Sequence, residues 1–459
     1  MEISVNTGHG RLGLFLVSII IIFLVLGTVL IVTDKMIAGL VCMVIPAIVL
    51  TVSHPRLAPY FYVFCVFITR PLNASPPILF IDLVAILLIG ALVLDHLVNC
   101  RTVIGLPAIY KYYLGLLLIM IMSAVFAYDF TRSINPILRV SIQLIMIIVI
   151  YNIIPAIKIK RILEFYFWVA VVHAIYNSLF FFLSAGTMRV FGSAGVYFDD
   201  LAMLAVPIGL AWFIWQESGR KSLVYGFGTV GLIFGLLATQ SRGPMLTIGW
   251  VGAVIVVWSI FRARRIRAAF VSRRLKSLLT AGLMMLLILP VFSDIFSQVG
   301  GRYAELGDPS RGTIWLRLSL WRTSLITFIN NPLTGIGPGN YRIAEELYPF
   351  LKFDPARLYV GGLSAHNLFL HYLAETGIFG ALCLTTLFYK HFRTALGLLS
   401  KFNDRKTQPI VMALFGVGLI IFFTIFYLDG WMWGQNSYVA AFFIAVTAGT
   451  AREINSNQE

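Results

Sequence analysis

One histidine and several arginines are the residues of this sequence best suited to chemistry. His366 lies in Ser364-Ala-His-Asn367, directly before a long apolar stretch. The arginines stand in connectors between such stretches, at Arg189, Arg242, Arg302, Arg311, Arg317 and Arg322. Arginine presents a planar fork of donors that matches phosphate, and an imidazole can accept a proton near neutral pH. The combination favours a site for a phosphate-bearing ligand, such as a lipid-linked diphosphate.

Each of these residues also has an ordinary structural explanation. Arg242 could extend its stem along apolar surface and reach water with its charged end. Arg322 is better explained as part of the solvated face of an amphipathic helix, and Arg302 as an ion-pair partner of Glu305. A single histidine at the end of a helix, such as His366, is more often structural than catalytic. The functional interpretation therefore depends on the group and not on any one member.

The same residues do not indicate metal chemistry. His371 follows His366 by five positions, which separates the two side chains by about 140° around a helix. The four cysteines have no paired spacing that would indicate a disulfide framework or a zinc site. Gly335-Ile-Gly-Pro-Gly-Asn340 resembles a nucleotide-binding loop only superficially, because no strand precedes it. We interpret it as a tight turn and expect neither a metal nor a cofactor.

Membrane-spanning helices are the elements that must position these residues. The sequence is 59% hydrophobic and only 12% charged, and apolar stretches of about 20 residues recur from end to end. Backbone groups inside a bilayer must be bonded internally, which helices achieve and open sheets do not. We therefore predict an all-α, polytopic transmembrane bundle of about 14 spans. The number falls to about 12 or 13 if the short stretch 56–70 and the closely joined pair 222–240 and 243–261 are counted differently.

The distribution of charge predicts the orientation of the chain and argues against nucleic acid as a partner. The net charge of +15 comes from basic residues in short connectors. The most basic connector lies between Arg262 and Lys276 and contains no acidic residue, so the positive-inside rule places it in the cytoplasm. Alternation then places both termini in the cytoplasm. It places Arg189, Arg242 and the loop 295–366 outside.

The chain is expected to divide at its one long hydrophilic loop. Residues 1–294 would form the first eleven spans, 295–366 the external loop, 367–450 the last three spans and 451–459 a cytoplasmic tail. Loops of such length are usually functional or contain their own elements. Within this loop, the stretch from Trp315 to Ile329 has apolar residues at helical spacing and predicts an amphipathic helix. The apolar set consists of Leu316, Leu320 and Leu325.

Four segments resemble the signature of the O-antigen ligase and polymerase superfamily. Two of them are Asn331-Pro-Leu-Thr-Gly-Ile-Gly-Pro-Gly-Asn-Tyr341 and Ala365-His-Asn-Leu-Phe-Leu-His-Tyr-Leu-Ala-Glu-Thr-Gly-Ile-Phe-Gly380. The segments Arg189-Val-Phe-Gly192 and Gln240-Ser-Arg-Gly243 are similar to two motifs that stand earlier in that family. Their order, spacing and expected side of the membrane agree with the family. The resemblance covers about residues 185–390.

This resemblance implies a metal-independent membrane glycosyltransferase in the bacterial inner membrane, with its active site in the periplasm. Such enzymes transfer a glycan from undecaprenyl diphosphate to an acceptor hydroxyl. His366 matches the family histidine proposed to activate or orient the acceptor. The arginines that the resemblance assigns to the donor diphosphate are Arg189, Arg242, Arg317 and Arg311. Asn367 would belong to the pocket.

The sequence departs from the family after its first motif. Relatives often have an Asn-Pro-Asn-like segment where this chain has Tyr197-Phe-Asp-Asp200. Asp199 and Asp200 are a second candidate for a base, although we favour pairing with arginine. The resemblance does not separate ligase from polymerase, and it leaves lipid A core, a growing glycan or a protein side chain as the acceptor.

Two other functions are compatible with a polytopic chain. A transporter of a small anion such as bicarbonate should carry polar groups deep in its spans, and few are evident beyond Glu164 near a span end. A scaffold for other envelope enzymes would not explain the grouping of histidine with arginine. The glycan-transfer interpretation is therefore favoured.

Overall fold

A computed structural model describes most of the chain as helices. The described residues are 57–67, 80–98, 105–153, 159–183, 198–239, 241–265, 271, 274, 312–348, 364–401, 404–427 and 435–456. The regular elements within them are α3 (Ala58–Val66), α4 (Phe80–Val98), α5 (Tyr110–Val125), α6 (Phe130–Ile153), α7 (Ile159–Leu183), α8 (Phe198–Trp215), α9 (Gly219–Ala238), α10 (Arg242–Arg265), α13 (Gly312–Asn330), α14 (Tyr341–Leu347), α15 (Leu368–Lys401), α16 (Gln408–Thr424) and α17 (Gln435–Ser456).

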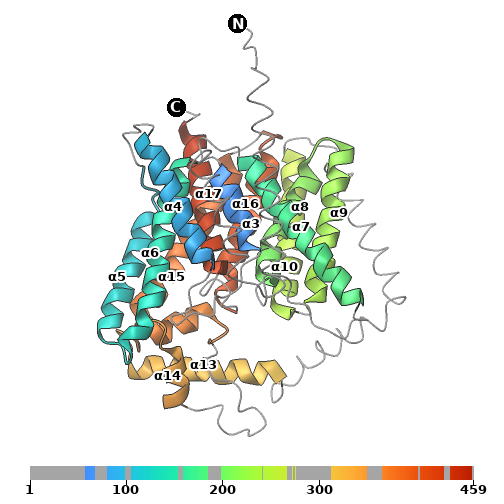
Figure 1. The fold of residues 1–459 in the computed structure, drawn as a ribbon. Coiled ribbons are helices and arrows are strands. Elements are labelled where there is room, and N and C mark those ends of the chain that lie inside the picture. Colours follow the sequence, from blue (N-terminus) through green and yellow to red (C-terminus); the bar gives the residue numbers. More distant parts are fainter. Residues whose placement is uncertain are drawn as a thin grey trace.

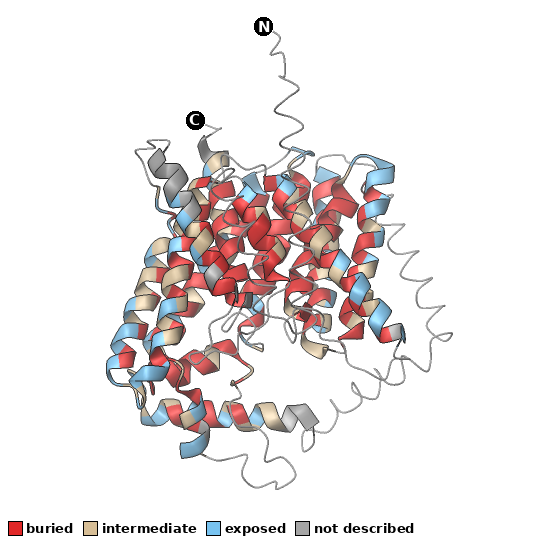
Figure 2. Ribbon diagram, viewed as in Figure 1, coloured by how far each residue is buried: buried red, intermediate tan, exposed pale blue. Residues whose placement is uncertain are grey.

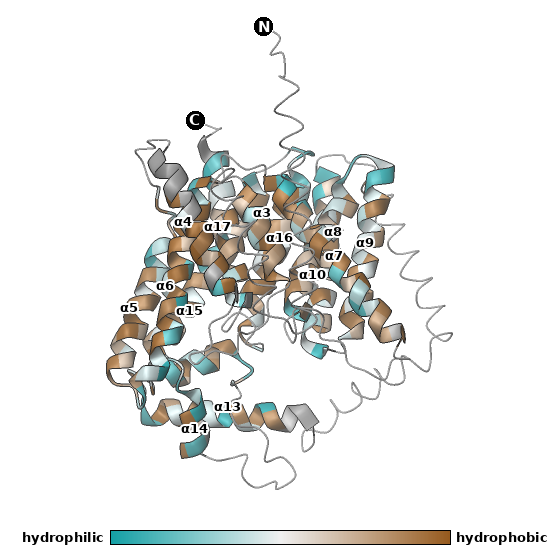
Figure 3. Cartoon of the chain, viewed as in Figure 1, coloured by the Kyte–Doolittle hydropathy of each residue, from teal (hydrophilic) through white to brown (hydrophobic). Residues whose placement is uncertain are grey.

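The helices have the length and composition of a multi-pass membrane protein. Six described helices are long and apolar enough to cross a membrane, namely α6, α7, α8, α9, α10 and α15, and the apolar α5 and α16 are shorter. Figure 3 shows apolar residues along most of the bundle, with hydrophilic residues on α14 and at the upper end of α9. The prediction of an all-α transmembrane bundle is confirmed.

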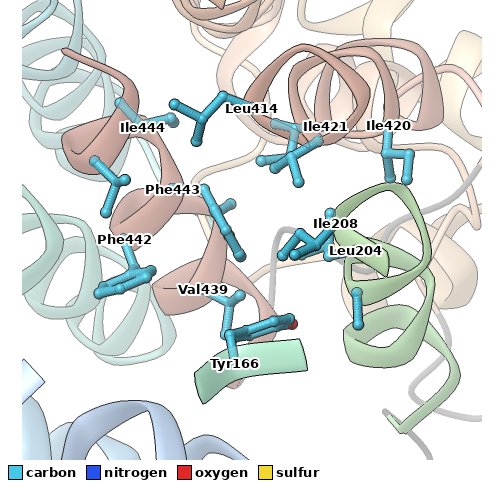
Figure 4. Close-up of a cluster of buried hydrophobic side chains, with 14 of the residues drawn as sticks. Tyr166, Leu204, Ile208, Leu414, Ile420, Ile421, Val439, Phe442, Phe443 and Ile444 are labelled. Atoms are coloured by element: carbon cyan, nitrogen blue, oxygen red, sulfur yellow. The ribbon is translucent and has the colours of Figure 1, made fainter. Parts of the chain in front are cut away.

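The centre of the bundle is built around α8, which packs against α7, α9, α10 and α16. Side chains from α7, α8, α16 and α17 interdigitate there, among them Tyr166, Leu204 and Phe443 (Figure 4). Outer helices instead expose large apolar side chains, such as Met122 on α5 and Phe227 on α9 (Figure 2). Such exposure is unusual for a soluble protein but suits contact with lipid tails.

Close helix packing depends on small residues. A Cβ atom added to Gly235 of α9 would come within 2.6 Å of the Cα of Ala174 on α7. Membrane helices use such residues because lipid supplies no hydrophobic force to bring helices together, so close van der Waals packing must do it. Gly235 therefore allows α9 to lie close to α7.

Helix α13 lies across one end of the bundle, with α14 beside it (Figure 1). It ends at Asn330, directly before Asn331-Pro332, as the sequence predicts. The expected apolar face is only partly correct, because Leu320 is fully buried whereas Leu325 is 45% exposed. The inward face of α13 also carries the buried hydroxyl residues Thr323, Ser324 and Thr327, which bond to carbonyl groups.

Helix α15 is divided in two by Gly377, whose φ of 66° and ψ of −167° are not helical. Its outer segment, 368–376, packs against α13 and α14, and its inner segment, 378–401, packs within the bundle. After Gly377 the helix continues to Lys401. His366 consequently lies before a short helical segment that precedes the long one.

Candidate functional site

His366 stands at the entrance to α15 in an unusual backbone conformation. Its φ is 49°, and it is the only non-glycine with positive φ among the residues that the structure describes. The following residue, Asn367, is buried and caps the helix, because its Oδ1 accepts a hydrogen bond from the backbone N–H of Leu370 at 3.0 Å. Its Nδ2 donates to the carbonyl of Phe426 at 2.6 Å, which fixes the segment to the end of α16.

Arg242 begins α10 and is half-buried. The hydroxyl of Tyr427, at the end of α16, lies 2.7 Å from Oγ1 of Thr247 and accepts a hydrogen bond from Nε1 of Trp250 at 3.4 Å. The end of α16 therefore contacts both the first turns of α10 and the segment that contains Asn367. This connection places Arg242 and His366 at the same end of the bundle.

The two acidic residues lie in the first turn of α8, where the positive end of the helix dipole favours them. Asp199 is buried, and Asp200 Oδ2 accepts a hydrogen bond from Nδ2 of Asn436 at 2.8 Å. Asn436 lies in the first turn of α17. Both acids thus belong to the end of the bundle that α13 crosses.

Of the remaining predicted arginines, the structure describes only those on α13. Arg317 is half-buried on α13, and Arg322 is exposed on the same helix, as expected for a solvated face. Arg189, Arg302 and Arg311 lie outside the described residues. The structure therefore brings Arg242, Asp199, Asp200, His366 and Asn367 to one end of the bundle, with the helix that carries Arg317 lying across it (Figure 1).

The sequence analysis missed a buried polar cluster close to His366. His371 Nε2 lies 3.1 Å from Oε1 of Glu375, and both side chains are almost fully buried. The ring of Tyr341 stacks on His371 with centroids 4.5 Å apart. The i,i+4 spacing of His371 and Glu375 was the signal that could have revealed this pair in the sequence.

A second buried cluster joins three other helices. Nε of Arg139 lies 3.5 Å from Oδ1 of Asp82, which also accepts a hydrogen bond from the hydroxyl of Tyr438 at 2.6 Å. These charged residues were overlooked because each stands within a few positions of the end of an apolar stretch. The expectation that few polar groups lie inside the bundle is therefore wrong for this end.

A small cavity of about 30 Å³ lies between the two clusters. Arg139 and Glu375 both line it, together with Gln143, Tyr372 and Ser437. Nε2 of Gln143 donates to the hydroxyl of Ser437 at 2.8 Å, so part of this polar wall is internally bonded. Charged groups are expensive to bury in a membrane protein and usually mark function.

This end of the molecule combines a histidine on a constrained backbone, a half-buried arginine at a helix start and buried carboxylates. Residues 227–385 match the family model described as O-antigen ligase. This part of the chain is similar to O-antigen ligases. The superfamily resemblance inferred from the sequence motifs is thereby confirmed.

A curated relative agrees with the O-antigen ligase match. The chain is 28% identical over 258 residues to the exopolysaccharide production protein ExoQ of Rhizobium meliloti (strain 1021). The match covers 52% of this chain and 51% of that protein, so the chain spans about half the length of the curated relative. The residues that match the O-antigen ligase model include Arg242, Arg317 and His366, whereas Asp199 and Asp200 precede them.

Proposed function

We propose that this protein transfers a glycan from undecaprenyl diphosphate to an acceptor hydroxyl at the periplasmic face of the inner membrane. The observation that carries the proposal is that Arg242 and His366 lie at the same end of the bundle, within the residues that match the O-antigen ligase model. Residues 124 positions apart in the chain serve a common site only if the fold brings their helices together, and the end of α16 contacts both segments.

In the proposed reaction, the acceptor oxygen attacks the anomeric carbon of the donor glycan. The bond from that carbon to the diphosphate oxygen breaks, and the acceptor proton passes to the imidazole of His366. Undecaprenyl diphosphate leaves with the bonding electrons. Its negative charge would be stabilised by preorganised guanidinium groups, which we assign to Arg189, Arg242, Arg317 and Arg311.

The buried polar residues near the proposed site would shape its pocket. Asn367 would hold the backbone of His366 through its contacts with α16. Asp199 and Asp200 would support the first turn of α8, and the bond from Asn436 to Asp200 agrees with a supporting role. The proposed reaction uses no metal and no cofactor, because histidine supplies the base and arginine supplies the positive charge.

The charge distribution supports a periplasmic site. Arg262, Arg264 and Arg265 lie in the last turn of α10, at the opposite end from Arg242. Lys160 and Arg161 begin α7, and Arg220 begins α9. Excess basic residues favour the cytoplasmic side. The end with α13 would then face the periplasm, and both termini would be cytoplasmic.

The acceptor that we propose is a growing glycan, so the product would be a polysaccharide. The name of the relative, an exopolysaccharide production protein, supports this choice over attachment to lipid A core or to a protein. Mass spectrometry of the product made by the purified protein distinguishes these outcomes. A product with repeats of the donor unit would support polymerisation. A product with a single glycan on a lipid or a protein would contradict the growing glycan as acceptor.

The transfer itself is tested with the protein in lipid nanodiscs and a labelled undecaprenyl-diphosphate glycan. His366→Gln should reduce the rate by about 100-fold to 10,000-fold, because a positioned base contributes that much. His391→Gln, in the inner segment of the same helix, is the control. Unchanged transfer by the His366 variant would remove this residue from the catalytic role.

The matching test for the donor site compares two arginines at opposite ends of α10. Arg242→Gln should raise the KM for the donor and lower the rate, because it removes a phosphate-binding fork. Arg264→Gln lies at the exposed, far end of α10 and should have wild-type kinetics. Equal kinetics for the two variants would argue against donor binding by Arg242.

Transport of a small anion such as bicarbonate is the second candidate. The observation in its favour is the cavity lined by Arg139, because a transporter needs a polar path through its helices. In the structure Arg139 is paired with the carboxylate of Asp82, which also accepts a hydrogen bond from the hydroxyl of Tyr438. Uptake of labelled bicarbonate by sealed vesicles would support transport, and uptake equal to that of protein-free vesicles would exclude it.

A further inference from the structure

The outer segment of α15 contains a buried histidine that the proposed transfer does not use. We infer that His371 and Glu375 are positioning residues, which hold the backbone around His366 and the neighbouring glycine loop in their working arrangement. This inference rests on the proposed function for its effect on rate. The positioning itself can be tested without any transfer assay.

His371 is bonded to the residue directly before His366. Its Nδ1 accepts a hydrogen bond from the backbone N–H of Ala365 at 3.4 Å. Because Nδ1 accepts, a neutral ring carries its proton on Nε2, and Nε2 is the atom that lies 3.1 Å from Glu375. One imidazole therefore connects the segment 364–367 to the body of α15.

Glu375 connects the same ring to the glycine loop. Its Oε1 accepts a hydrogen bond from the backbone N–H of Tyr341 at 2.9 Å, and its carbonyl accepts from the N–H of Gly337 at 2.9 Å. The hydroxyl of Ser123 donates to the same carbonyl at 2.9 Å. Glu375 thus joins α5, the loop before α14, and α15.

The glycine loop can approach Glu375 this closely only because it lacks side chains. Gly335 has a φ of 65°, and a Cβ atom on it would collide with the carbonyl group of Glu375. The N–H of Ile336 donates to the carbonyl of Ala374 at 3.1 Å, so backbone bonds continue along this contact. The loop has little freedom to move independently of Glu375.

The conformation of His366 explains why such support is needed. A residue with a side chain pays a free-energy cost for a left-handed backbone, and it keeps that conformation when the surroundings determine it. Ala365 lies on one side of His366 and is bonded to His371, whereas Asn367 lies on the other and is bonded to Phe426. If the first connection is lost, the imidazole of His366 should move relative to the donor.

The test uses two histidines of α15 that are equally buried. His371 and His391 are each 1% exposed, so His371→Phe and His391→Phe disturb packing to a similar degree. His371→Phe keeps a ring to stack on Tyr341 but removes both nitrogens. His371→Asn is the conservative variant, because its Oδ1 can accept the hydrogen bond that Nδ1 accepts.

The first measurement is amide hydrogen exchange of peptides that contain Ala365 and Tyr341. Exchange should become faster in His371→Phe than in His391→Phe, and His371→Asn should restore slow exchange at Ala365. The second measurement is transfer kinetics. His371→Phe should lower kcat by about 10- to 100-fold, as expected for a small misplacement of a catalytic group, with KM for the donor changed by less than about threefold.

Three results would overturn the inference. The first is equal exchange in the two phenylalanine variants. The second is faster exchange with unchanged kcat, and the third is a loss of kcat that His371→Asn does not relieve. If the wild-type protein transfers no glycan, the proposed function fails. If His366→Gln transfers glycan at the wild-type rate, only the catalytic role of His366 fails. In both cases the exchange of Ala365 still decides whether His371 positions this segment.

Discussion

The two segments of α15 on either side of Gly377 use the same helical backbone for different purposes. The inner segment buries a regular series of mostly apolar residues, at 380, 381, 384, 387, 388, 391, 395, 398 and 399. Their spacing is that of a helix with one buried stripe. The outer segment instead buries His371 and Glu375 and contacts Tyr341, the first residue of α14. A regular apolar stripe is typical of a scaffold, and here it is interrupted at the candidate site.

The first way to break this comparison is to change the residue that separates the two segments. Gly377 has a φ of 66°, and a Cβ atom on it would collide with the carbonyl of Leu333. Gly377→Ala should therefore lower the free energy of unfolding by about 3 kcal/mol or more, since backbone strain and overpacking each cost about 1–3 kcal/mol. Thermal unfolding in detergent would measure the loss.

The matched control for Gly377 is Gly397, in the inner segment. A Cβ atom there would meet nothing within 4 Å. Gly397→Ala should raise stability by up to about 1 kcal/mol, because alanine is the better helix former. If the two alanine variants unfold at the same temperature, the division of α15 at Gly377 is not a constraint on the folded state.

The sequence predicts the buried face of the inner segment but not the contacts of the outer segment, and the difference has a physical reason. Apolar periodicity reports which side of a helix faces other helices, so the bundle follows from the sequence. The order of charges likewise placed Arg242 and His366 at a common end. The contact of Glu375 with Tyr341 joins residues that are 34 positions apart in the chain. No local sequence pattern predicts such a contact.

The site residues show the same limit. Asn367 could be recognised as a neighbour of His366, but its bond to Phe426 requires the packing of α15 on α16. The pair of Asp82 and Arg139 lies on two helices that are separated in sequence by α5. In the sequence, each charged residue stands near the end of an apolar stretch, where a charge is expected to reach water. Only the packed bundle shows that Asp82 and Arg139 form an ion pair.

The second prediction sharpens the comparison by changing one charge in the outer segment. Glu375→Gln keeps the shape of the side chain but removes the charge that faces His371. It should lower the free energy of unfolding by about 1.5–3 kcal/mol, the usual contribution of hydrogen bonds to a charged group. Glu217→Gln, at an exposed position, should change stability by less than about 0.5 kcal/mol.

Denaturant unfolding in mixed micelles would compare the two glutamine variants. An equal effect would mean that Glu375 contributes only its shape. In that case the outer segment would be held by its backbone bonds, such as the N–H of Gly337 to the carbonyl of Glu375, and the apolar scaffold would explain both halves of α15.

The third and smallest expected effect concerns the cap of the outer segment. Asn367→Ala removes the side-chain bonds to Leu370 and Phe426 and should lower stability by about 1 kcal/mol, the usual value of an N-cap. Asn330→Ala, at the exposed end of α13, should change stability by less than about 0.5 kcal/mol. Because Asn367 adjoins His366, its loss should reduce glycan transfer by more than the stability change alone accounts for. If transfer falls only in proportion to the folded fraction, the cap stabilises the outer segment without orienting His366.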